Sequence, residues 1–114
     1  KITNVNHLAN TLIKLNCGGN CGIDQDGIKD LKKLKYLYAN NNNKIKNVNH
    51  LGNTLIELYC ENNCGINQNG IMNLKILRIL NANNNKYINN VNHLANTLMK
   101  LKCRENSGID QDGI

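Results

Sequence analysis

The sequence contains no proline, tryptophan or phenylalanine, and tyrosine supplies all four of its aromatic residues. Asparagine, in contrast, makes up 26 of the 114 residues, a composition that by itself is typical of a disordered polar tract. No apolar run approaches the ~20 residues needed to cross a bilayer, and no signal-peptide pattern opens the chain. We therefore expect no membrane partner.

The sequence also lacks the residue groupings that catalysis requires. The pair Gly18-Gly19 is not followed by the Lys and Ser/Thr of a phosphate-binding loop. A nucleophile needs a base within hydrogen-bond reach, and here the thiols and histidines recur along the chain with no unique partner. We predict no catalytic residue, no cofactor and no enzymatic activity. The formal net charge of +6 permits acidic partners without requiring them.

The dominant feature of the sequence is a repeat at two levels. The motif Asn-Val-Asn-His-Leu recurs every 43 residues, with its valine at Val5, Val48 and Val91. A shorter pattern, Leu-x-x-Leu-x-(Cys/Ala)-x-x-Asn-x-x-Ile, recurs in alternating steps of 22 and 21 residues. It begins at Leu12, Leu34, Leu55, Leu77 and Leu98. This regularity argues against disorder and predicts a solenoid of stacked coils.

The repeats predict that residues 1–114 form a single array of about five coils. Solenoids normally end in atypical capping repeats, and none is visible at either end of this sequence. We therefore expect the chain to be an excerpt of a longer array. The sequence leaves the oligomeric state open.

Each coil is predicted to contain a short strand, because segments such as Leu15-Asn16-Cys17 alternate apolar and polar residues. Stacking the coils makes a parallel sheet. The Ile-x2-Val-x2-Leu spacing of alternate coils predicts a short 3₁₀ segment on the outer surface. An asparagine side chain suits the turn after the strand, since it carries donors and an acceptor for adjacent main chain. We predict a ladder of inward-pointing asparagines at Asn20, Asn42, Asn63, Asn85 and Asn106.

The five in-register copies of this pattern resemble the leucine-rich-repeat family in its 21 to 22 residue form. Cys or Ala replaces the third leucine of the pattern in every copy, which thins the packing layer. The asparagine-rich style is also similar to repeat proteins of giant viruses and amoebae. The resemblance implies an α/β solenoid, a right-handed coil with a parallel sheet on its concave face and short 3₁₀ or irregular segments on its convex face. It also implies that the concave face binds another protein.

The cysteines fall in two columns of the array, Cys17, Cys60 and Cys103 in one, Cys21 and Cys64 in the other. Members of a column lie two coils apart, roughly 10 Å, whereas a disulfide needs Cα atoms within about 7 Å. Only pairs within a coil therefore remain possible. We predict free, packing thiols, with the first column shielded, and an intracellular, cytoplasmic setting; the host cytoplasm or a virion is the alternative.

The histidines and the acidic turns do not predict a metal site. His7, His50 and His93 repeat every second coil, too far apart for one zinc ion. The segment Asp24-Gln25-Asp26-Gly27 and its copy at 110–113 lack the further oxygen ligands of a calcium loop. We expect convex surface histidines and a turn in which Asp26 or Asp112 lies near a helix start.

Function is expected where the copies diverge on an exposed surface, and the outward strand positions meet that condition. Tyr38 and Tyr59 share a column on successive coils, so their rings are expected to stack beside Tyr36. Clustered exposed tyrosines are typical interface anchors. The predicted partner-binding residues of the concave face are Lys14, Asn16, Tyr36, Tyr38, Glu57, Tyr59, Glu61, Ile79, Asn81, Lys100, Lys102 and Arg104.

These features favour a non-enzymatic module that binds a protein or peptide through the tyrosines, with the basic edge of Lys100, Lys102 and Arg104 setting its orientation. Nucleic-acid binding is the alternative, because the chain is basic and tyrosines stack on bases. Glu57 and Glu61 interrupt the aromatic patch and argue against it. A third hypothesis is a structural scaffold repeat in a larger, viral assembly.

Overall fold

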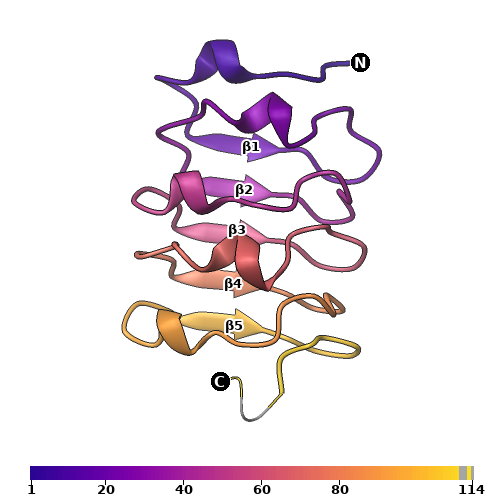
Figure 1. Cartoon of the computed structure of the whole chain (residues 1–114), viewed down its shortest axis with the longest axis vertical. Coiled ribbons are helices and arrows are strands. Elements are labelled where there is room, and N and C mark those ends of the chain that lie inside the picture. Colours follow the sequence, from indigo (N-terminus) through magenta and orange to yellow (C-terminus); the bar gives the residue numbers. More distant parts are fainter. Residues whose placement is uncertain (111–112, 114) are drawn as a thin grey trace.

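The computed structural model describes residues 1–110 and 113 and shows a stack of coils joined by one sheet (Figure 1). The five strands are all parallel and pair in sequence order, and their leucines Leu15, Leu37, Leu58, Leu80 and Leu101 lie in register. The molecule measures 40 × 27 × 19 Å. The strands are β1 (Lys14–Asn16), β2 (Tyr36–Tyr38), β3 (Glu57–Tyr59), β4 (Ile79–Asn81) and β5 (Lys100–Lys102). The predicted parallel sheet is confirmed.

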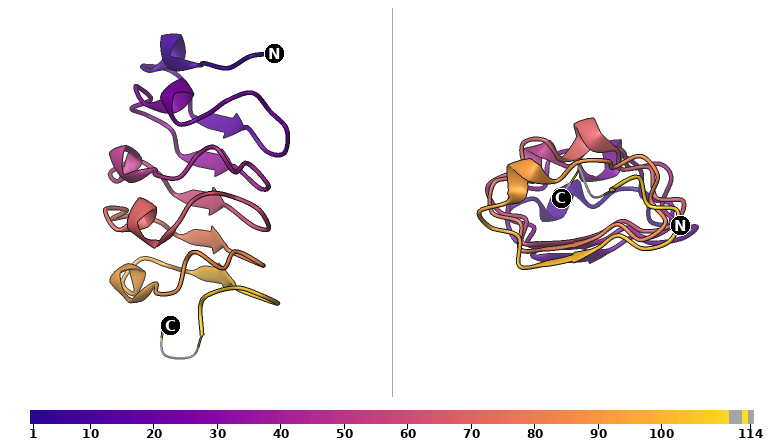
Figure 2. Two further views of the ribbon diagram at one scale, coloured as in Figure 1. Left: turned by 45° about the vertical axis from the view of Figure 1, so that its right-hand side comes forward. Right: turned by 90° about the horizontal axis from the view of Figure 1, so that it is seen from below.

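Short 3₁₀ turns cover the side of the stack opposite the sheet, as the end-on view of Figure 2 shows. Three of them carry the recurring Asn-His-Leu segment in the coils for which the sequence predicts 3₁₀ geometry. The intervening coils, in the first of which the sequence predicts a helix start near Asp26, contain one as well. The five turns are η1 (Asn6–Leu8), η2 (Asp26–Ile28), η3 (Asn49–Leu51), η4 (Gln68–Ile71) and η5 (Asn92–Leu94).

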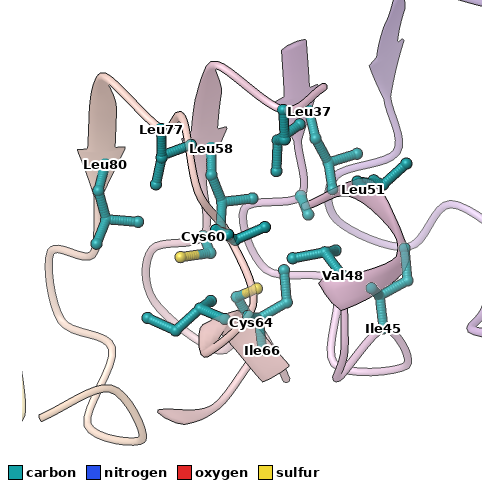
Figure 3. Close-up of a cluster of buried hydrophobic side chains, with 14 of the residues drawn as sticks. Leu37, Ile45, Val48, Leu51, Leu58, Cys60, Cys64, Ile66, Leu77 and Leu80 are labelled. Atoms are coloured by element: carbon teal, nitrogen blue, oxygen red, sulfur yellow. The ribbon is translucent and has the colours of Figure 1, made fainter. Parts of the chain in front are cut away.

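The core is a narrow ribbon of Leu, Ile and Val between the sheet and the 3₁₀ turns (Figure 3). In the middle coils Leu37, Leu58 and Leu80 are completely buried, whereas Leu12 and Leu101 in the outer coils are only partly covered. Burying one such side chain contributes roughly 1.5 to 3 kcal/mol. Each coil therefore gains most of its stability from the coils on either side of it.

The asparagine ladder forms in alternate coils only. Asn42 and Asn85, in the coils of β2 and β4, are buried as predicted. Asn20, Asn63 and Asn106, in the coils of β1, β3 and β5, are exposed, so the prediction for these three is wrong. In those coils the residue one position later turns inward instead; these residues are Cys21, Cys64 and Ser107. The inward position of these coils is thus shifted by one residue, although the residue with positive φ is the third after the strand in every coil.

The Asn42 side chain replaces the main-chain partners that the turn removes. Its Nδ2 donates to the carbonyl oxygens of Cys17 (2.8 Å) and Ile23 (3.0 Å) in the preceding coil. Its Oδ1 accepts from the main-chain N–H groups of Lys44 (2.9 Å) and Ile45 (3.2 Å) in its own coil. Asn85 repeats the pattern one 43-residue unit later. A smaller side chain leaves these buried groups without partners.

Glutamine and asparagine also join the coils on the side of the 3₁₀ turns. Gln25 Oε1 accepts from the N–H groups of Lys46 and Asn47, both at 2.9 Å, and its Nε2 donates to Asn47 O at 2.8 Å. Asn49 Nδ2 donates to Asn69 O, while its Oδ1 accepts from Asn73 N, both at 2.8 Å. Many of the abundant amides therefore serve the fold.

Replacing Asn42 with Ala is expected to destabilise the protein by roughly 1 to 3 kcal/mol, because it leaves buried carbonyl and N–H groups unpaired. Asn63→Ala is the matched control: its side chain is exposed, and its loss is expected to change stability by less than about 0.5 kcal/mol. Urea unfolding followed by circular dichroism measures both. Equal effects of the two substitutions would contradict the division of the ladder into buried and exposed members.

Candidate functional site

The side chains that point away from the core along the five strands form one continuous surface, which we call the strand face. The parallel register places the residues of each column on adjacent coils, about 4.8 Å apart. One column is Lys14, Tyr36, Glu57, Ile79 and Lys100. The other is Asn16, Tyr38, Tyr59, Asn81 and Lys102.

A stacked pair of tyrosines occupies the centre of the strand face. The rings of Tyr38 and Tyr59 are nearly parallel, with an angle of 6° between their planes and 4.5 Å between their centroids. The Nζ atom of Lys14 lies 5.3 Å from the Tyr38 centroid, within range of a cation–π interaction. Both tyrosines are half-buried. The stack therefore holds two aromatic side chains in a fixed geometry while leaving part of each ring exposed.

A hydrogen bond fixes one tyrosine of this stack. The Tyr59 hydroxyl donates to Glu57 Oε1 at 2.8 Å. Desolvation, together with the hydrogen bond to Glu57 and the negative charge of its carboxylate, raises the pKa of Tyr59 to about 12. The phenol therefore keeps its proton at neutral pH and remains a donor to the Glu57 carboxylate.

The remaining predicted face residues differ in exposure. Tyr36 and Ile79 are half-buried beside the stack, and Glu61 is half-buried at its border. Asn16, Lys100, Lys102 and Arg104 are exposed, so the basic edge lies at one end of the face.

Asn81 is the least accessible of the predicted face residues: it is 8% exposed, and its Oδ1 accepts from Asn83 N at 3.2 Å. Its amide therefore supports the turn after β4, as Asn16 supports the turn after β1.

Two asparagines beyond the strands, which the sequence analysis did not single out, continue the link between coils. Asn40 Oδ1 accepts from Glu61 N at 2.9 Å, and Asn83 Oδ1 accepts from Arg104 N at 2.8 Å. Each amide thus fixes the main chain at the exit of the next strand, where Glu61 and Arg104 lie. The sequence could have indicated them through their shared position, two residues after the strand in alternate coils.

The five cysteines are free thiols, as predicted. Cys17, Cys60 and Cys64 are buried, whereas Cys21 and Cys103 are half-buried, so the shielding expected for Cys103 is incomplete. Cys103 follows β5, and among the described residues a neighbouring coil covers it only on the β4 side. Burial is the main cause that raises the pKa of Cys17 to about 12.

The pKa of Cys60 is raised well above its ordinary value by a hydrogen bond to the Cys64 sulfur and by burial (Figure 3). Both of these thiols lie in the core of the β3 coil, among leucine and isoleucine side chains. They therefore belong to the packing of the coil.

The histidines and acidic turns have structural partners. Nε2 of His50 lies 3.0 Å from Ile28 O, and Nε2 of His93 lies 3.1 Å from Ile71 O. Asp26 is the first residue of η2, as predicted, and Asp24 Oδ1 accepts from Gly27 N at 3.0 Å. Asp112, the other predicted residue, lies outside the described residues. Within residues 1–110 and 113, no group of three or more His, Cys, Asp or Glu is placed to hold a metal ion.

No family model, curated protein or solved structure matches this chain. None of the helical turns among the described residues is long and apolar enough to span a membrane. The assignment of function therefore depends on the chemistry of the chain's own surfaces.

Brief alkylation of the native protein with iodoacetamide, read by mass spectrometry, is expected to label Cys21 and Cys103 first. The buried thiols Cys17, Cys60 and Cys64 should become reactive only on unfolding, because packing excludes the reagent. For Cys17 and Cys60 a raised pKa also lowers the thiolate fraction, whereas the hydrogen bond with Cys60 lowers the pKa of Cys64, so burial alone protects that thiol. Alkylation of the unfolded protein without reductant should modify all five. Recovery of fewer would reveal a disulfide, and early labelling of Cys60 would contradict its burial.

A spectrophotometric titration should show Tyr59 ionising near pH 12. Glu57→Gln is expected to lower this pKa, because the phenolate then forms beside a neutral amide instead of a carboxylate. Glu61→Gln serves as the control, since Glu61 makes no hydrogen bond to this phenol. An unchanged titration of Glu57→Gln would show that the carboxylate does not hold the Tyr59 proton.

Proposed function

We propose that the chain is a non-enzymatic protein-interaction module that binds a protein or peptide on the strand face. The observation that carries the proposal is the Tyr38–Tyr59 stack, a pair of half-buried rings at the centre of that face with Tyr36 beside it. Tyrosine is enriched among residues that dominate binding energy, because its large ring contacts a partner through few rotatable bonds. The stack fixes these rings before binding and so reduces the entropic cost of association.

The charges around the stack favour a peptide or protein over a uniformly charged polymer. Glu57 and Glu61 lie next to the rings, and Lys14 lies at the other side of Tyr38. Lys100, Lys102 and Arg104 form a basic edge that sets the orientation of the partner through an acidic segment. The mixed polarity is typical of protein interfaces with an aromatic centre and a polar rim.

We also propose that the array belongs to the leucine-rich-repeat class, with right-handed coils and a concave strand face. The support comes from the Leu-x-x-Leu pattern, the all-parallel sheet of three-residue strands and the short 3₁₀ turns on the opposite side. In such arrays the strands line a surface that is long enough to contact an extended partner.

Nucleic-acid binding is the second candidate, because the exposed residues Lys100, Lys102 and Arg104 lie on the same face as the tyrosines. Phosphates bind to such cations, and unpaired bases stack on aromatic rings. The two glutamates beside the stack repel phosphates and make this candidate the weaker one.

The double variant Tyr38→Ala, Tyr59→Ala is expected to lose the partner proteins that the immobilised chain captures from lysate. Unfolding should change little, because outward sheet positions contribute little to the core. Tyr87→Ala is the matched control, since Tyr87 is 50% exposed but lies off the strand face. Capture that survives the double variant and is lost with Tyr87→Ala would contradict the proposal.

Oligonucleotide binding at low and high salt separates the two candidates. A protein-binding module should show little binding at either salt concentration. Tight binding that weakens steeply with salt, and weakens for every sequence when Lys100, Lys102 and Arg104 are replaced by Gln, would instead establish the nucleic-acid function. Fluorescence anisotropy of a labelled single strand measures both.

A further inference from the structure

A groove with a volume of about 580 Å³ lies beyond the carboxyl ends of β2 to β5, off the strand face. We call it the exit groove and define it by six of its lining residues from four successive coils. These are Asn43 and Lys46, Asn63, Lys86 and Tyr87, and Asn106. Two of them, Asn63 and Asn106, are the asparagines that point outward because the next residue, Cys64 or Ser107, takes the inward position.

The alternation of the coils creates this groove. In the β2 and β4 coils the buried asparagine is followed by outward side chains, and those of Asn43 and Tyr87 line the groove. In the β3 coil the corresponding segment contains Gly65, whose Cβ would lie 2.7 Å from Asn43 O if it had one. The β3 coil therefore packs closely on the β2 coil, and position 65 places no side chain in the groove between the β2 and β4 turns.

The charge of the exit groove favours an anion. Lys46 comes from the β2 coil and Lys86 from the β4 coil, so two lysines of different coils line the groove. None of the described residues that line the groove carries a carboxylate. A groove lined by one sign of charge concentrates a ligand of the opposite charge.

The other side chains of the groove suit hydroxyl groups and a flat apolar face. The side-chain amides of Asn43, Asn63 and Asn106 make no hydrogen bond within the described residues, in contrast to Asn42 and Asn85. A free amide offers both donors and an acceptor, as a hydroxyl requires. The Tyr87 ring is 50% exposed, with Lys86 Nζ 5.6 Å from its centroid, and presents an aromatic surface on which a sugar ring can pack.

We propose that the exit groove binds a small polyhydroxylated molecule that carries a phosphate or sulfate group, with Lys46 and Lys86 holding the oxyanion. The amides hold the hydroxyl groups, and Tyr87 contacts the carbon skeleton. The groove volume lies within the roughly 300 to 1,000 Å³ of small-molecule sites. This proposal is independent of the protein-binding function, because the strand face contributes no residue to the groove's defining set.

The test is an NMR titration of the ¹⁵N-labelled chain with the phosphate and the sulfate esters of glucose at its primary hydroxyl. Free glucose and inorganic phosphate are titrated separately. The esters are expected to shift the side-chain amide signals of Asn63 and Asn106 and to bind more tightly than either component. The double variant Lys46→Gln, Lys86→Gln should weaken binding about tenfold, because it removes both ammonium contacts. Tyr87→Ala should weaken ester binding while leaving phosphate binding unchanged.

Lys44→Gln is the matched control, since Lys44 is exposed on the same turn as Asn43 but does not line the groove. Equal affinity for glucose and its esters would overturn the role of the oxyanion, and equal affinity for inorganic phosphate would overturn the role of the hydroxyl groups. Absence of shifts with both esters, or affinity unchanged in the double lysine variant, would overturn the site itself.

Discussion

The structure depends on how each coil satisfies its main-chain groups where the chain leaves the sheet. Each strand is only three residues long. The residues that follow it turn inward over the core, where water cannot form hydrogen bonds to their main-chain N–H and C=O groups. In alternate coils one asparagine side chain supplies this pairing, reaching back to two carbonyls and forward to its own turn. Polar turns can then enclose an apolar ribbon without leaving a buried side-chain N or O atom unpaired in the described part of the chain.

The same requirement explains why the unit repeats every 43 residues and not at every coil. The coils of β2 and β4 place an asparagine inside, whereas those of β1, β3 and β5 place a cysteine or serine one position later. A small thiol or hydroxyl reaches fewer main-chain groups than an amide does. Two kinds of coil therefore alternate, and the recurring motif Asn-Val-Asn-His-Leu belongs to one kind only. Its Asn49 and His50 bond to main chain of the following and preceding coils.

Most of the fold could be predicted from the sequence, because the leucine period sets the strands and their register directly. The outward position of Asn63 could not, because Leu58 precedes it by the same five residues that separate Leu37 from the buried Asn42. The spacing to the next isoleucine, Ile45 or Ile66, is also the same in both coils, so apolar periodicity gives no sign of the shift. The available signal was local: Cys64 is apolar and small, and Gly65 after it permits the close approach to Asn43 O.

The candidate surfaces differ in how far the sequence could locate them. The tyrosine stack follows from strand alternation alone, so the pairing of Tyr38 with Tyr59 could be predicted from the sequence, whereas the hydrogen bond from Tyr59 to Glu57 could not. The exit groove arises from the difference between neighbouring turns and was not predicted. A strand face gains one row of side chains with every coil, whereas a groove of this kind needs two asparagine coils with a glycine-containing coil between them. In a longer stack of these units, the strand face would therefore extend with every coil, and grooves would recur only once per 43-residue unit.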